Sequence, residues 1–418
     1  MIFCMLLASF VPWEVISQEL ILVQTVFRHG DRAPMGDFTS PESESYYFRG
    51  RQHLTNKGVE QAYRLGATLR RMYVDTGFLD SRYLPSEVMF RSSASARCLM
   101  TASTAASAMF NETESGLSTP IPIFTEPKEK DYVCVPRIQC PFVMDDMRTV
   151  LKVTNKSYGI EDLLQELFRQ EAKVLNFTRV VGKRLRKFEP LFLEHESGMP
   201  VPKWFDDRAR KEADHLLDLT IEFISGTGSF YNPRWMLTRS GKLLFTILDN
   251  QQKTAEGKIG DTKFFAFSTH DATISSLLES FGVMKEALAP QGRPDFTSAV
   301  TFELYRNGTE YSVKVLYRSG VIRDDFVDIS GKIKKCAGME ACPLDVLTKS
   351  VAEFQTDNPE SLCEVTELKK IVAEFQPLTM VFMFTTVIST ILFLSALFLL
   401  MRYRTTLEKD SKLHHTRI

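Results

Sequence analysis

The segment from Phe27 to Pro34 carries the side chains best suited to chemistry in this sequence. It reads Phe-Arg-His-Gly-Asp-Arg-Ala-Pro, so that Arg28 and Arg32 bracket His29. Guanidinium groups match phosphate oxygens with paired hydrogen bonds and stay charged at any working pH. A neutral imidazole between them could attack a phosphorus atom that they hold. The alternative interpretation is that His29 is a structural histidine, without a catalytic role, in a basic turn. A chance match to Arg-His-Gly-x-Arg-x-Pro has odds of roughly one in ten thousand in a chain of this length.

Two further segments offer groups of the same kind. Ser268-Thr269-His270-Asp271-Ala272-Thr273 contains a His-Asp pair, and Phe90-Arg91-Ser92 contains a third arginine. Taken alone, the His-Asp pair is weak evidence, because Asp271 could simply cap the helix that follows it. Arg91 alone is one more basic residue at the end of a strand.

Each of these segments follows an apolar stretch that predicts a β-strand. Leu20–Phe27 is nearly all apolar, as in a strand buried on both faces of a parallel sheet, and Glu87–Phe90 and Phe264–Ser268 are two further candidates. Helical patterns follow all three, at Thr55–Tyr73, Ser95–Met109 and Thr273–Phe281. This alternation predicts an α/β fold with a mostly parallel sheet, in which ligands bind at the carboxyl ends of the strands.

The middle of the chain has a different character. Residues 141–240 contain no convincing strand but carry charged helical stretches at Ile160–Gln170 and Asp206–Phe223. We expect a helical cap here, on a core made of residues 18–140 and 241–377. Near the end, Val300–Tyr305 and Glu310–Tyr317 flank Asn307-Gly308, which predicts a β-hairpin because this pair tolerates the positive φ angles of a tight turn.

Both ends of the chain indicate export and anchoring. Residues 1–17 resemble a signal peptide, with an apolar run and a small residue at Ser17; the alternative is a buried first helix. Residues 378–401 contain no charge and are long enough, at about 36 Å, to cross a bilayer as a transmembrane helix. Arg402 and Arg404 then place the tail 402–418 in the cytosol, which makes the chain a single-pass type I membrane protein.

Composition and cysteine usage agree with this placement. With 51 basic and 52 acidic residues the chain has no overall basic field, so we expect no nucleic-acid partner. Six cysteines remain after Cys4 is removed with the signal peptide, and an even number in an oxidising compartment suggests disulfides. Sequons that could be glycosylated after export occur at Asn111, Asn155, Asn176 and Asn307.

These segments together resemble the histidine acid phosphatase family, from about Glu19 to the transmembrane helix. The resemblance implies that His29 is the nucleophile and Asp271 the proton donor. It makes Arg28, Arg32, Arg91 and His270 the ligands of the substrate phosphate, and it implies neither a metal nor a cofactor. It also pairs Cys140 with Cys363 and Cys336 with Cys342, leaves Cys98 and Cys134 without counterparts, and suggests a homodimer.

We therefore expect a three-layer α/β/α sandwich with a mostly parallel central sheet, a helical cap and one C-terminal transmembrane helix. The expected activity is hydrolysis of phosphate monoesters, on small molecules or phosphoproteins, through a phosphohistidine intermediate. Two alternatives are a narrower phosphatase of the phytase or inositol-phosphate type, and a catalytically silent surface protein of the same fold. The tail lacks a complete tyrosine-based sorting signal at Tyr403-Arg404-Thr405-Thr406, which favours the cell surface over the lysosome.

Overall fold

One mixed sheet organises the part of the chain that the computed structural model describes, which is residues 18–110, 119–136, 140, 142–143, 146–147 and 185–415. Eight strands form the sheet, in the order β3-β2-β4-β1-β5-β6-β7 with β8 paired to β6. The strands are β1 Glu19–Arg28, β2 Val88–Ser92, β3 Ile123–Phe124, β4 Phe264–Thr269, β5 Ala299–Asn307, β6 Glu310–Arg318, β7 Val327–Asp328 and β8 Cys342–Pro343.

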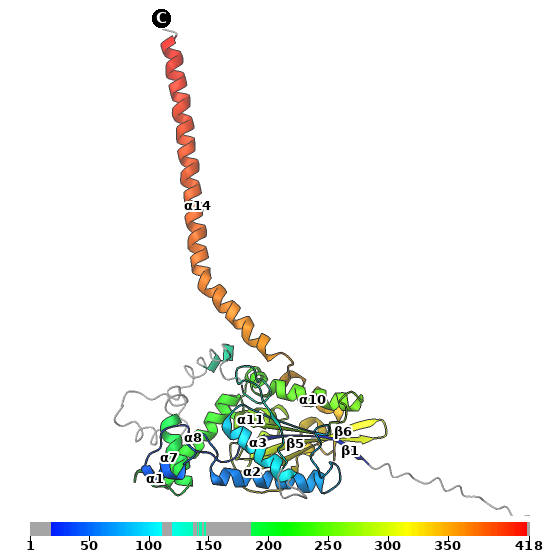
Figure 1. Cartoon of the computed structure of the whole chain (residues 1–418). Helices are drawn as coiled ribbons and strands as arrows, with labels where there is room; N and C mark the ends of the chain where they lie inside the picture. Colours follow the sequence, from blue (N-terminus) through cyan, green and yellow to red (C-terminus); the bar gives the residue numbers. More distant parts are fainter. Residues whose placement is uncertain are drawn as a thin grey trace, which may run out of the picture. The chain divides into compact units, whose positions relative to one another are not determined.

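Helices fill most of the remaining described sequence (Figure 1). The α-helices are α1 Pro41–Tyr46, α2 Asn56–Leu69, α3 Ala96–Met109, α7 Leu185–Glu196, α8 Asp207–Ser225, α9 Pro233–Met236, α10 Lys242–Ala255, α11 Asp271–Ser280, α12 Met284–Leu288, α13 Leu344–Ser350 and α14 Pro359–His415. Short π-helical segments are η1 Arg70–Val74 and η5 Leu237–Gly241. Short 3-10 segments are η4 Gly228–Phe230, η6 Ser330–Lys332, η7 Lys334–Cys336 and η8 Ala352–Phe354.

The predicted alternation of strand and helix is confirmed for β1, β2 and β4, and these strands pair in parallel. The sheet as a whole is mixed and not mostly parallel as expected. The pairings of β1 with β5, of β5 with β6, and of β6 with β7 and β8 are antiparallel. The cause is the predicted hairpin, which is confirmed as β5 and β6 around Gly308 at φ +62°. A hairpin joins its strands antiparallel, and here it extends the free edge of β1.

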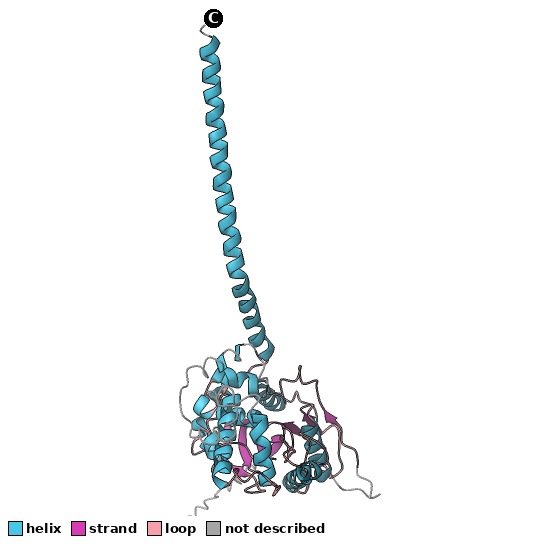
Figure 2. Cartoon of the chain, turned by 90° about the vertical axis from the view of Figure 1, so that its left-hand side faces the viewer, coloured by secondary structure: helices cyan, strands magenta, loops and turns pink. Residues whose placement is uncertain are grey.

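Helices pack against both faces of the sheet, as Figure 2 illustrates from a second side. Alternate residues of β1 belong to two different core clusters. Val23 and Phe27 pack with side chains of α2 and α3, whereas Leu22 and Val26 pack with side chains of α10 and α11. The sheet is therefore shielded from water on each side, and its strand ends are held in fixed positions.

In the described part of residues 141–240 the structure contains helices and no strand. The helix expected at Asp206–Phe223 is α8, which Asp206 caps by accepting hydrogen bonds from the backbone N–H groups of Arg208 and Ala209. Gly226 ends it in the left-handed conformation at φ +74°. The stretch Ile160–Gln170 lies outside the described residues, as do the predicted signal peptide 1–17 and the sequons at Asn111, Asn155 and Asn176.

The chain divides into two compact units, Met1–Pro359 and Glu360–Ile418. Within the described residues, one helical stretch is long and apolar enough to cross a membrane by length and composition, Thr379–Thr405, with a mean hydropathy of 2.3. It covers nearly all of the predicted segment 378–401.

Cys336 and Cys342 form a disulfide bond, as the resemblance implied. Cys140 and Cys363 are also disulfide-bonded cysteines, and the bridge predicted between them remains a proposal. Cys98 and Cys134 are buried free thiols, and burial raises the pKa of the Cys98 thiol to about 12. Both therefore remain protonated over the physiological range.

Candidate active site

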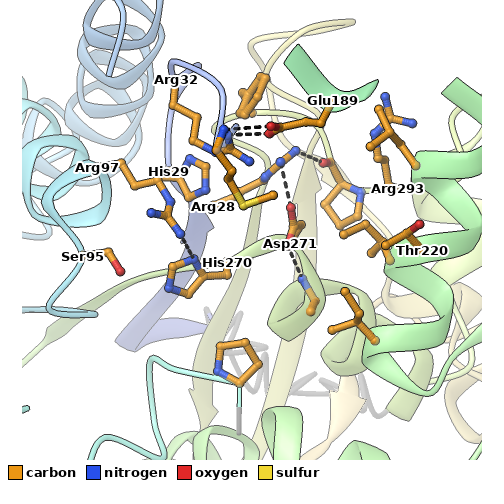
Figure 3. Close-up of a pocket in the computed structure, with 18 of the residues that line it drawn as sticks. Arg28, His29, Arg32, Ser95, Arg97, Glu189, Thr220, His270, Asp271 and Arg293 are labelled. Carbon is orange, nitrogen blue, oxygen red and sulfur yellow. Dashed lines mark hydrogen bonds and ion pairs between the residues drawn. The ribbon is translucent and has the colours of Figure 1, made fainter. Parts of the chain in front are cut away.

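The segments selected from the sequence meet because their strands are neighbours. In the parallel order β2-β4-β1, Ser92 is in register with Ser268, and Arg28 is in register with Thr269. The residues that follow each strand therefore emerge at one edge of the sheet. Figure 3 shows the result, with His29 after β1, His270 and Asp271 after β4, and Arg97 from the start of α3.

His29 is buried, with 2% of its surface exposed, and its ring is fixed by the backbone. Its Nδ1 lies 2.9 Å from the carbonyl oxygen of Gly30. Because a carbonyl oxygen can only accept, Nδ1 carries the proton and Nε2 keeps a free lone pair. Burial lowers the pKa of His29 well below 6.5, and the charges of Arg97 and Arg28 lower it further. The imidazole therefore keeps its neutral, nucleophilic form at a lower pH than an ordinary histidine.

The loop after β1 is held to its neighbours by its backbone. The N–H of Gly30 donates to Thr101 Oγ1 at 3.0 Å, and the N–H of Asp31 donates to Gln61 Oε1 at 2.8 Å. Gly30 also lies against Gly58 of α2, so closely that a Cβ on Gly30 would stand 2.4 Å from the Gly58 carbonyl oxygen. Glycine is needed at both positions to let the loop and the helix approach this closely.

Three arginines lie around His29 and His270. Arg28 Nη2 lies 2.8 Å from Asp271 Oδ2, Arg32 Nη1 lies 2.7 Å from Glu189 Oε1, and Arg97 Nη2 lies 3.4 Å from His270 Nδ1. In each of the three guanidinium groups the buried Nε has no hydrogen-bond partner among the described residues. All three arginines line one pocket, and positive charges gathered in this way are what an anion-binding site requires.

Asp271 is the first residue of α11, and His270 occupies the N-cap position. Asp271 is therefore not the N-cap residue of α11. Its Oδ1 nevertheless accepts a hydrogen bond from the backbone N–H of Ala272, in the first turn, at 2.8 Å. Burial alone would raise the pKa of this carboxyl. Arg28 and then His270 oppose burial, and the net pKa lies below the usual value of 3.8.

His270 lies across the pocket floor from His29, with ring centroids 5.8 Å apart and the rings edge to face. Its Nε2 is hydrogen-bonded to Ser93 Oγ at 3.0 Å. Burial lowers the pKa of His270, and Arg97 lowers it further, so this ring is also neutral. Arg97 donates to Nδ1, which leaves the proton on Nε2, directed at Ser93.

The structure does not bring Arg91 to this pocket, which corrects its assignment as a phosphate ligand. Arg91 pairs instead with Asp131 and Glu126, at 3.1 Å each. Asp131 is fully buried, so Arg91 balances a structural carboxylate. Arg97 lines the pocket instead, and its Nη2 contacts His270 Nδ1. The sequence did contain a signal for Arg97, because this residue lies in the first turn of the helix predicted after β2. That helix begins near the carboxyl end of β2, at the edge of the sheet where the site lies.

The pocket has a volume of about 420 Å³ and walls of two kinds. The polar end contains the arginines and histidines described above, together with Ser95 and Glu189. Helices α7 and α8 and the loop before β5 supply mainly apolar side chains, with Arg293 and Asp295 among them. No group of three or more His, Cys, Asp and Glu side chains that could hold a metal ion occurs among the described residues.

Residues 19–318 match the family model of the histidine phosphatase superfamily, branch 2, and the chain belongs to this superfamily. It is 30% identical over 406 residues to the Caenorhabditis elegans protein named "Putative acid phosphatase 1", covering 93% of each chain. It is 28% identical to human prostatic acid phosphatase, covering 76% of this chain and 82% of that protein.

Solved structures extend the likeness of fold. A Hafnia alvei phytase in complex with tartrate superposes with a TM-score of 0.59 at 16% identity, covering 82% of this chain and 98% of the phytase. At that identity the likeness concerns the fold alone. The chain is a phosphatase of the histidine phosphatase superfamily, and its relatives of higher identity carry the name acid phosphatase.

Proposed function

We propose that this chain is an acid phosphatase that converts phosphate monoesters to an alcohol and inorganic phosphate through a phosphohistidine on His29. The observation that carries the proposal is the Nε2 lone pair of a neutral, buried His29, surrounded by Arg28, Arg32 and Arg97. The arginines would bind the phosphate oxygens, with Arg97 as the third in place of Arg91. His270 would join them if its Nε2 exchanged Ser93 for a phosphate oxygen.

The reaction follows in two displacements. Nε2 of His29 attacks phosphorus, a P–N bond forms, and the P–O bond to the leaving group breaks while Asp271 gives its proton to the departing oxygen. Water then attacks the phosphohistidine, the P–N bond breaks, and Asp271 takes a proton from that water. The free-enzyme ion pair of Arg28 with Asp271 must loosen first, because the incoming phosphate competes for the same guanidinium.

The proposed domain architecture, membrane topology and glycosylation rest on the sequence features described above. We propose a three-layer sandwich with a helical cap, an ectodomain outside the cytosol, a single type I membrane span within Thr379–Thr405 and glycosylation at the four sequons. The cell surface is preferred to the lysosome, and a homodimer follows from the family resemblance.

The direct test is hydrolysis of 4-nitrophenyl phosphate at pH 5 by washed membranes of cells expressing the full chain, with a metal chelator present. His29→Ala should lower kcat by about 1,000-fold or more, because the nucleophile is lost. His215→Ala is the matched control, since His215 is exposed on α8 and does not line the pocket, and it should keep wild-type activity. Full activity in His29→Ala would reject the proposal.

A further inference from the structure

Helix α8 presents a second apolar face in addition to the one that packs into the protein. Leu216, Leu219 and Phe223 are buried. Leu217 and Ile221 are only partly buried, and both line the pocket, as does Ile224. The spacing of four and then three residues puts these three on one face of the helix. They form an apolar stripe, Leu217-Ile221-Ile224, that is open to whatever occupies the pocket.

Other elements continue this apolar wall. Phe192 and Leu193 of α7 line the pocket next to the stripe, and Phe296 of the loop before β5 lines it as well. The ring of Phe296 also packs under the Arg28 guanidinium, 4.2 Å from its centroid. In Figure 3, Thr220 of α8 lies on the side of the pocket where Asp271 and Arg293 lie, away from Arg97 and Ser95. The part of α8 that carries the stripe is thus on the same side of the pocket as the proposed proton donor, where a leaving group would sit.

The charges in this part of the pocket do not suit a second phosphate. Outside the three phosphate-binding arginines, the pocket-lining lysines and arginines of the described chain are Lys128 and Arg293. Arg293 is already paired with both Asp214 and Asp218. Asp295 adds an acidic group to the lining, while Glu189 is already paired with Arg32. Lys128 acts electrostatically on His270, at the polar end of the pocket. Beside Arg293 and Asp295, a leaving group with further phosphates would therefore meet neutralised or negative surroundings.

We propose that the pocket selects phosphate monoesters whose leaving group is uncharged and apolar, with Ile221 as the central specificity-determining contact. This inference rests on the proposed function and narrows its substrate class. A methylene group that moves fully from water to an apolar site is worth about fourfold in an equilibrium constant. The stripe is partly open, so we expect about two- to threefold in kcat/KM for each added methylene.

The test compares ethyl, butyl and hexyl phosphate, whose leaving alcohols differ little in acidity, on washed membranes carrying the full chain. In the wild type, kcat/KM should rise at least tenfold from ethyl to hexyl phosphate. Ile221→Ser should reduce the hexyl-to-ethyl ratio at least threefold. Ile21→Ser is the matched control, because Ile21 is also partly buried but lies at the opposite end of β1 from His29, and it should keep the wild-type ratio.

Equal kcat/KM for all three esters, or faster hydrolysis of inositol hexakisphosphate than of hexyl phosphate, would overturn the substrate class and leave the phosphatase proposal standing. An unchanged ratio in Ile221→Ser would overturn the role of the stripe. If no monoester were hydrolysed, 4-nitrophenyl phosphate included, the proposed function itself would fall and this inference with it.

Discussion

Arg28 links the two protonation states on which the proposed chemistry depends. Its charge helps to keep His29 neutral, and it also favours the ionised form of Asp271, 2.8 Å away. The nucleophile thus stays neutral to a lower pH than an ordinary histidine would, whereas the proton donor is scarce except in acid. A bound phosphate anion would oppose the field of Arg28 and raise the pKa of Asp271. The donor therefore limits the rate as pH rises.

We expect a pH optimum below 6, with an alkaline limb set by Asp271. Because the pKa of Asp271 lies below its usual value in the free enzyme, its acid form is lost as pH rises through that range. Asp271→Asn should lower kcat about 100-fold or more for alkyl phosphates, but far less for 4-nitrophenyl phosphate, whose leaving group needs little protonation. Steady-state kinetics on both esters measure this. An equal loss on both, or a wild-type optimum near pH 8, would refute the donor role.

Two arginines close in sequence should behave differently when each is replaced by alanine. Arg97→Ala should lower kcat/KM about 100- to 1,000-fold with little change in Tm, because it removes a charge that stabilises the transferred phosphoryl group. Arg91→Ala should destabilise the fold by about 2–4 kcal/mol, because it leaves the buried Asp131 without its partner. Kinetics and thermal melting of both variants separate the roles. The reverse pattern would restore the original assignment of Arg91.

At the scale of elements, the close approach of Gly30 and Gly58 fixes the nucleophile loop to α2. Gly30→Ala should lower both kcat and Tm, because its Cβ would meet a backbone carbonyl oxygen that cannot move without α2. Gly331→Ala serves as the control, since its Cβ would make only ordinary contact at 3.5 Å. Activity and melting of each variant are the measurements. A Gly30→Ala enzyme as active as Gly331→Ala would show that the approach does not matter.

The strands and helices around the site could be predicted from the sequence because each has a clear periodic pattern. The apolar run of β1, the strand-helix pairs and the Asn-Gly hairpin all lie within two residues of their expected ends, except that α2 ends at Leu69, where the π-helical segment η1 continues to Val74. The role of Arg97 could not be assigned in this way. Its place in the first turn of α3 could be predicted, but the direction of its side chain depends on how α3 packs against the sheet.

Contacts between segments far apart in the chain also could not be predicted from the sequence. Glu189 of α7 reaches Arg32, 157 residues earlier in the chain, and their pairing follows from how α7 packs beside the loop after β1. The apolar stripe on α8 is visible as residue types, but only the folded chain shows that it faces the pocket. Sequence patterns describe single elements well and their mutual packing poorly.

At the scale of the whole molecule, the reactive groups and the candidate membrane span lie in different parts of the chain. The parallel strands β2, β4 and β1 bring the reactive groups to one edge, while the antiparallel hairpin extends the sheet away from them. The apolar span belongs to a separate unit of the chain, Glu360–Ile418. Activity should therefore not depend on the span.

Truncation after Phe375 should release a soluble enzyme into the culture medium with the kcat of the membrane-bound form. The full chain should remain in the membrane pellet after washing with high salt, because about 25 apolar residues hold it there. Fractionation and activity assays on both forms check this. A truncated protein that stays in the pellet, or a full chain found in the cytosol without glycans, would contradict the proposed topology.

The most direct test of the central claim is to trap the covalent intermediate. Full-length protein is mixed with a phosphate monoester labelled in its phosphate, quenched within milliseconds under alkaline conditions that preserve phosphohistidine, and mapped by peptide mass spectrometry. We predict label on His29 at Nε2, since Nδ1 is occupied by the Gly30 carbonyl. The label should be absent in His29→Ala and should accumulate with a 4-nitrophenyl ester in Asp271→Asn, where water attack lacks its base. Label on any other residue, or rapid turnover without label on His29, would contradict the account.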